Sequence, residues 1–256
     1  MAARTAGTTT SQTPTPYPTE HDERSGDAWL GRTRVVLTPL AAPSILGLFG
    51  FFTGTIMVGT NIAGWWGSGS SGLALWPFAL TAGGIAQLLA GMWSYRARDG
   101  LATAMHGIWG AFWIAYGILQ LLVATHVATA VPLGQPDPAF GMWFVALASI
   151  TMMGAVASLA ESLGLFAVLA ALAGGSGIFA AGLFAGSLTA DRVAGWFFVV
   201  SAAAAWYTAS AMMLAGTSGR TLLPLGKWSA AANIPLREPV KPLEYAAGEP
   251  GVRAGQ

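Results

Sequence analysis

The 256-residue chain contains no cysteine, which excludes disulfides, thiolate metal sites and cysteine catalysis. It is also poor in charge: Asp, Glu, Lys and Arg make up 9% of its residues, against about a quarter in a soluble protein. Residues 35–95 contain none of these four and no histidine. Since 54% of the residues are hydrophobic, the composition predicts a membrane protein that crosses the bilayer several times.

The sequence shows no pattern typical of a nucleic-acid, metal or catalytic site. The net charge of +1 comes without any basic run, so no nucleic-acid partner is expected. Clustered metal ligands, paired carboxylates and a Ser/His/Asp constellation are not found in or beside the apolar segments. We therefore expect no metal, no cofactor and no enzymatic activity.

Six apolar segments are each long enough to span a bilayer, which takes about 20 helical residues. The fold class expected is an all-α membrane protein with a bundle of six transmembrane helices. Residues 39–217 would form this domain, while the polar segments 1–38 and 218–256 would be disordered tails. Asp191 and Arg192 would lie in a loop, which leaves no Asp, Glu, Lys or Arg inside the membrane. The expected spans are residues 44–65, 73–95, 101–126, 140–160, 162–188 and 193–215.

The distribution of Lys and Arg predicts the orientation. An even number of spans places both termini on one side, and of the 12 Lys and Arg residues only Arg192 falls on the other side. Positive residues gather on the cytoplasmic side of membrane proteins. Both termini are therefore expected in the cytoplasm, with the protein in the plasma membrane.

Five ordered motifs resemble those of the acetate uptake transporter family, which includes the bacterial succinate–acetate permeases and their fungal relatives. Ala-Pro-Ser-Ile-Leu-Gly-Leu is similar to the family's Asn-Pro-Ala-Pro-Leu-Gly-Leu, and Trp-Gly-Ala-Phe-Trp to its Tyr-Gly-Ala/Ser-Phe-Trp. Gly-Arg-Thr-Leu-Leu-Pro-Leu-Gly is similar to its Gly-Arg-Thr-Val-Leu-Pro-Ile-Gly. The five motifs occupy residues 42–48, 83–91, 109–113, 194–196 and 219–226.

The resemblance implies a permease for short carboxylates, with acetate first and succinate as a further candidate, coupled to protons. It also implies a homo-oligomer, a hexamer in which each protomer has its own pore through the lipid bilayer. Three apolar or aromatic side chains constrict the pore in the family. Carried over by position, they are Phe51, Trp109 and Leu172.

Two groups of residues are candidates for contact with the substrate. In the first motif, Pro43, Gly47 and Leu48 open the first helix, where backbone N–H groups could meet an anion. Pro43 is equally compatible with an ordinary helix start. Thr53, Thr55, Thr60 and Asn61 place polar groups further along this helix, although Thr in a membrane helix often bonds to its own backbone.

Gln87 and His106 are the remaining candidates. An amide in the middle of a membrane helix is costly when unpaired, so Gln87 serves either to join helices or to line the pore. His106 lies three residues before Trp109 and could relay protons, because its unperturbed pKa is about 6.5. An interfacial position near the helix end is the alternative and the favoured interpretation.

Span number and composition leave other functions open. A pore without fixed charge also suits a channel for urea, ammonia or water. A membrane subunit that transports nothing and binds a partner through its tails is a third possibility. The five motifs favour the carboxylate permease.

Overall fold

The computed structural model describes residues 40–68 and 70–228, and in these residues every regular element is helical. Six helices among them are long and apolar enough to cross a membrane, which confirms the six-span bundle. The expected tail at residues 1–38 lies outside the described residues. The elements are α2 (Pro43–Ile62), α3 (Ser71–Phe78), η2 (Ala79–Ala86), α4 (Gln87–Ala97), α5 (Gly100–Ala124), α6 (Pro138–Ser158), α7 (Leu163–Ala185) and α8 (Leu188–Ser218).

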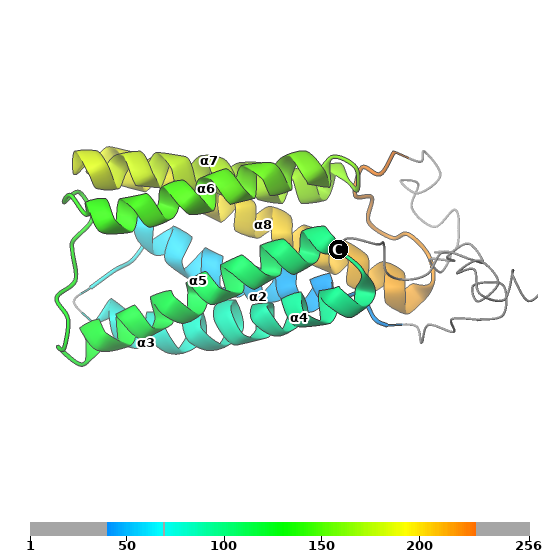
Figure 1. The fold of residues 1–256 in the computed structure, drawn as a ribbon, viewed down its shortest axis with the longest axis horizontal. Helices are drawn as coiled ribbons and strands as arrows, with labels where there is room; N and C mark the ends of the chain where they lie inside the picture. The colour runs from blue at the N-terminus through cyan, green and yellow to red at the C-terminus, as the bar shows by residue number, and fades with distance from the viewer. Residues whose placement is uncertain (1–39, 69, 229–256) are drawn as a thin grey trace, which may run out of the picture. The chain divides into compact units, whose positions relative to one another are not determined.

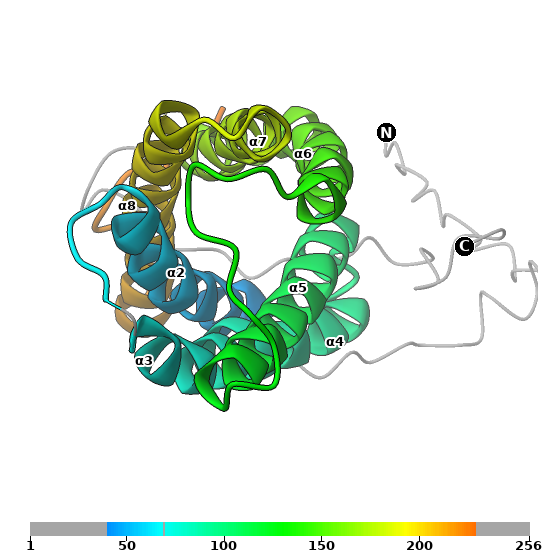
Figure 2. The same ribbon diagram turned by 90° about the vertical axis from the view of Figure 1, so that its left-hand side faces the viewer.

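The helices run side by side along one long direction (Figure 1). Seen end-on, they surround a central axis (Figure 2). Packing contacts link α6 to α7, α7 to α8, α8 to α2, α2 to η2 and α4, and α4 to α5. A smaller contact between α5 and α6 closes the ring. Side chains from all parts of this ring can therefore face one central space.

Polar residues fix the starts of four helices. The side chains of Asp99, Asp137, Ser162 and Ser187 each accept a hydrogen bond from the backbone N–H three residues later. Such caps satisfy donors that a helix start leaves without partners. Pro43 instead occupies the first position of α2, where its missing N–H costs nothing.

The boundary between the fifth and sixth spans corrects the sequence analysis. α7 ends at Ala185, Gly186 takes a left-handed conformation, and Ser187 caps α8, so that α8 begins at Leu188. Asp191 and Arg192 therefore lie in the first turn of α8 rather than in a loop, and Asp191 is 1% exposed. An acidic side chain is favoured there by the positive end of the helix dipole. The expectation that Asp191 and Arg192 lie in a loop was wrong, because the last helix begins at Leu188 and not at the expected Val193.

The second span is one 27-residue helical segment, Ser71–Ala97, with a π-helical middle. Pro77 lies two residues before η2 and cannot donate a backbone hydrogen bond. Thr81 donates its hydroxyl proton to the Pro77 carbonyl at 2.6 Å. The widened η2 packs closely on α2, since a Cβ added to Gly50 would lie 2.5 Å from the Ala82 carbonyl oxygen.

The beginning of the expected C-terminal tail is packed against the bundle. α8 ends at Ser218, and the Tyr207 hydroxyl then donates to the Pro224 carbonyl at 2.8 Å. The N–H of Leu163 donates to the Gly226 carbonyl, and that of Gly164 to the Leu225 carbonyl. This segment therefore covers the start of α7. Residues 229–256 of the expected tail lie outside the described residues.

Candidate functional site: a cavity inside the helix ring

A cavity of about 360 Å³ opens at the end of the bundle opposite residues 40 and 228. Its walls come from α2, α3, α5, α6, α7 and α8 and from the connection between α5 and α6, and it reaches the middle of α5 and α7. Among the described residues that line the cavity, Asp137 is the one Asp, Glu, Lys, Arg or His. The Asp137 carboxylate already accepts the Phe140 N–H as a helix cap. The cavity therefore has no cationic side chain to offer an anion.

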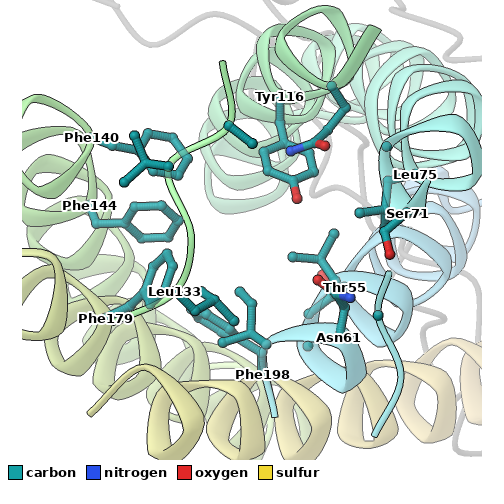
Figure 3. A pocket seen from close by; sticks show the side chains of 18 of the residues that line it. Thr55, Asn61, Ser71, Leu75, Tyr116, Leu133, Phe140, Phe144, Phe179 and Phe198 are labelled. Atoms are coloured by element: carbon teal, nitrogen blue, oxygen red, sulfur yellow. The ribbon is translucent and has the colours of Figure 1, made fainter. Parts of the chain in front are cut away.

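One wall of the cavity is aromatic. Phe140, Phe144, Phe179 and Phe198, from α6, α7 and α8, lie on one side of it in Figure 3. The Phe144 ring centroid is 5.1 Å from that of Phe140, 4.8 Å from Phe179 and 6.3 Å from Phe198. The first two pairs meet edge to face, a favourable geometry for aromatic rings. This wall presents no polar group to the cavity.

The facing wall carries hydroxyl and amide groups from α2, α3 and α5. In Figure 3 Ser71 lies across the cavity from Phe140, Phe144 and Phe179, with Tyr116 and Asn61 on the two sides between them. The Tyr116 hydroxyl is hydrogen-bonded to the side chain of Gln120, which also lines the cavity. Asn61 donates through Nδ2 to the Trp66 carbonyl at 2.9 Å. The cavity is therefore two-sided, with one apolar face and one uncharged polar face.

The floor of the cavity brings together the three residues predicted for the constriction. Trp109 and Leu172 line the cavity, and both are buried. Phe51 lies in edge-to-face contact with Trp109, with ring centroids 6.2 Å apart, and is buried in the same cluster. The Trp109 ring is held in place because its Nε1–H donates to the Thr151 hydroxyl of α6 at 3.0 Å. Phe51 is thus linked to Trp109 by a ring contact, and Leu172 to Trp109 by the cavity that both line.

The connection between α5 and α6, residues 125–137, crosses the end of the helix ring (Figure 2), and its residues 130–133 line the cavity. We call it the strap. The Gly134 N–H donates to Oδ2 of Asp191 at 2.8 Å, and the Asp137 N–H donates to the Leu183 carbonyl at 2.9 Å. Leu133 on the strap faces the cavity (Figure 3). The buried Asp191 therefore holds the strap over the opening.

The four polar candidates on α2 are placed differently. Thr60 donates its hydroxyl proton to the Ile56 carbonyl at 2.6 Å and does not line the cavity. Thr53 donates its hydroxyl proton to the Phe49 carbonyl at 2.9 Å and does not line the cavity. Asn61 lines it near the mouth. Thr55 also lines it, is buried, and its hydroxyl has no hydrogen-bond partner among the described residues. Of the three threonines, Thr55 is the one on the cavity side of α2.

The remaining candidates do not line the cavity and lie nearer the end of the bundle where α2 begins. They are Pro43, Gly47, Leu48, Gln87 and His106. His106 is 5% exposed, and its ring lies directly against Gly47, where a Cβ would be 2.5 Å from the imidazole. The imidazole is thus packed between helices, and within the described residues neither its Nδ1 nor Oε1 of Gln87 has a hydrogen-bond partner. The interfacial position and the proton relay both stay predictions. Leu48 is buried in the core, whereas Pro43 is half-buried at the start of α2.

The sequence analysis missed Ser71, Tyr116 and the phenyl wall. One signal was available, because Trp109, Phe112, Trp113 and Tyr116 repeat at helical spacing and all four line the cavity. The phenylalanines of α6, α7 and α8 offered no such signal, since most positions in these helices are apolar. No group of three or more His, Cys, Asp or Glu residues gathers within the described part of the chain.

Comparisons with known proteins agree with this architecture. The model of the GPR1/FUN34/yaaH family matches residues 27–225. An uncharacterized protein of Methanothermobacter thermautotrophicus is 32% identical over 75% of this chain and 95% of its own length. The succinate-acetate/proton symporter SatP of Escherichia coli is 30% identical over 74% of this chain and 97% of its own.

The likeness extends to a solved structure. The structure of the bacterial acetate channel SatP superposes with a TM-score of 0.66 at 27% identity, covering 73% of this chain and all of that one. The resemblance drawn from the five motifs is thus confirmed. With the family model matching most of its length, this six-span membrane protein belongs to the GPR1/FUN34/yaaH family.

Proposed function

We propose that this protein is a permease for short carboxylates, chiefly acetate, and that transport is coupled to protons. The observation that carries the proposal is the cavity inside the helix ring, which ends on Trp109 and Leu172. The proposal is also supported by the similarity of this chain to a succinate-acetate/proton symporter and to an acetate channel. We further propose that succinate is a poorer substrate than acetate.

The constriction is proposed to be Phe51, Trp109 and Leu172. Phe51 and Trp109 are in edge-to-face contact, Trp109 and Leu172 line the cavity, and a hydrogen bond from Trp109 to Thr151 holds the indole in place. An apolar narrowing of this kind gates by size and by exclusion of water. Because the described cavity lining contains no Lys, Arg or His, passage would depend on hydroxyl and amide groups or on the neutral acid.

Orientation and assembly are also proposals. The Lys and Arg distribution supports cytoplasmic termini in the plasma membrane. The cavity would then open to the outside. A hexamer with one pore in each protomer stays a prediction from the family resemblance.

The test is uptake of labelled acetate into liposomes that carry the purified protein, with and without an inwardly directed proton gradient. We expect uptake above that of empty liposomes, and a faster rate when the outside is acidic. Labelled urea and a water-permeability assay on the same liposomes test the alternative channel functions. Flux of urea or water without flux of acetate would refute the proposal.

A further inference from the structure

The two-sided cavity suggests a ligand larger than acetate. We propose that it binds monocarboxylic acids with an apolar tail of several carbons. The carboxyl group would lie at the wall of Ser71 and Tyr116, and the tail at the phenyl wall of Phe140, Phe144, Phe179 and Phe198. This inference rests on the proposed function only in taking a carboxylic acid as the ligand.

The first argument is size. A water molecule occupies about 30 Å³ in the liquid, so about 360 Å³ corresponds to roughly a dozen waters. Acetate, which is one methyl group and one carboxylate, would leave most of this volume to water. Cavities of about 300–1,000 Å³ with mostly apolar walls are the usual sites of larger organic ligands.

The second argument is the chemistry of the phenyl wall. Phe144 and its ring neighbours present only carbon to the cavity, so a water molecule there lacks hydrogen-bond partners on that side. An apolar tail that displaces such water gains free energy in proportion to the area that it covers. When the carboxylate of acetate lies at the wall of Ser71 and Tyr116, its single methyl group is too small to cover the phenyl wall as well.

The third argument is the state of the hydroxyl groups on the facing wall. Ser71 Oγ accepts a hydrogen bond from the Ser68 N–H at 2.7 Å, and its own proton remains available to a ligand. The Tyr116 hydroxyl is held by Gln120, and it retains its proton for a ligand when the Gln120 amide donates. Both hydroxyls are thus oriented by a protein neighbour while able to donate to a carboxyl oxygen.

The fourth argument concerns a second carboxylate. Among the described residues the lining holds no Lys, Arg or His, and the far wall is phenyl. A dicarboxylate would place its second charge against carbon, where an unpaired charge is strongly disfavoured. The cavity therefore selects monocarboxylic over dicarboxylic acids of the same length.

The experiment is a binding series by calorimetry on the full-length protein in lipid nanodiscs, with empty nanodiscs subtracted. The ligands are acetate, propionate, butyrate and pentanoate, with succinate as the dicarboxylate of butyrate's length. Each added methylene that is fully buried should tighten binding about fourfold. Succinate should bind at least about tenfold more weakly than butyrate.

Two conservative variants test the carboxyl subsite. Tyr116→Phe and Ser71→Ala each remove one hydroxyl and keep the shape of the wall. Each should weaken every acid of the series by a similar factor, about tenfold for the loss of a hydrogen bond to a charged group, and leave the dependence on chain length unchanged. The matched controls are Tyr95→Phe, at an exposed position on α4, and Ser149→Ala, whose exposed hydroxyl bonds to the Ala146 carbonyl.

The outcomes separate this inference from the proposed function. Affinity that is flat or falls from acetate to pentanoate overturns the inference, and acetate uptake in liposomes then still stands by itself. A rising series that Tyr116→Phe and Ser71→Ala leave unchanged also overturns it, because the carboxyl group would then lie elsewhere. A rising series that both variants weaken supports it, even if labelled acetate is not transported and the permease proposal fails.

Discussion

At the scale of single residues, Trp109 is the side chain on which the proposed selectivity depends most. It lines the cavity floor, its ring contacts Phe51 and Phe112, and its N–H is bonded to Thr151. Trp109→Ala should open the floor and admit larger anions, since an apolar constriction selects by size. We expect the succinate-to-acetate flux ratio in liposomes, measured per folded protein, to rise several-fold.

The matched control is Trp206→Ala on α8, where half of the indole is exposed and no cavity is lined. It removes the same side chain from the outside of the protomer, so the flux ratio should stay at the wild-type value. The same measurement on Phe51→Ala tests the second member of the constriction. An unchanged ratio in both Trp109→Ala and Phe51→Ala would remove these residues from the selectivity filter.

Only part of the candidate site could be predicted from the sequence, for a physical reason. Trp109 lies in a motif that could be compared with a family and Phe51 lies three residues after another, and the structure places these two rings in contact. Thr53 and Thr55 are two residues apart, and the direction that each faces depends on how α2 is rotated against η2 and α8. That rotation is fixed by glycine contacts between helices, which hydropathy does not encode.

At the scale of elements, the contact between α2 and η2 should be sensitive to volume. A Cβ at Gly50 would lie 2.5 Å from the Ala82 carbonyl oxygen, so Gly50→Ala must move one backbone against the other. Overpacking of this kind costs about 1–3 kcal/mol. We expect the melting temperature of the purified protein to fall, as followed by a thermal-shift assay in detergent.

The control for this prediction is Gly177→Ala in α7. A Cβ there meets no atom within 4 Å, and alanine is a better helix former than glycine by about 0.5–1 kcal/mol. The melting temperature of Gly177→Ala should equal or exceed that of the wild type. If Gly50→Ala melts at the wild-type temperature as well, the close approach of η2 to α2 is incorrect.

The strap is the second element that allows a direct test. Asp191→Ala removes the acceptor of the Gly134 N–H, and a hydrogen bond to a charged group contributes about 1.5–3 kcal/mol. The strap should then open more often, and amide hydrogen exchange in residues 125–137 should rise about tenfold or more. Mass spectrometry of peptides from this segment measures it. Thr189→Ala, an exposed change in the same helical turn, should leave the exchange unchanged.

At the scale of the whole molecule, the six spans followed from hydropathy because a bilayer sets the length of an apolar helix. The junction of α7 and α8 was less predictable. This junction is only two residues long. A charged residue such as Asp191 is expected in a loop when its hydrogen bond from Gly134 on the strap is not known. The packed segment after α8 was also missed, since residues 219–228 are held by backbone carbonyls that no side-chain pattern reveals.

The orientation of the molecule gives the last prediction. If Arg192 is the one positive residue on the outside, a C-terminal tag lies in the cytoplasm. Protease added to intact cells should leave that tag in place and remove it once the membrane is permeabilised. A cleavage site inserted into the strap at residue 128 should behave in the opposite way, because the strap lies at the other end of the bundle. Loss of the C-terminal tag from intact cells, with the strap protected, would reverse the orientation and turn the cavity toward the cytoplasm.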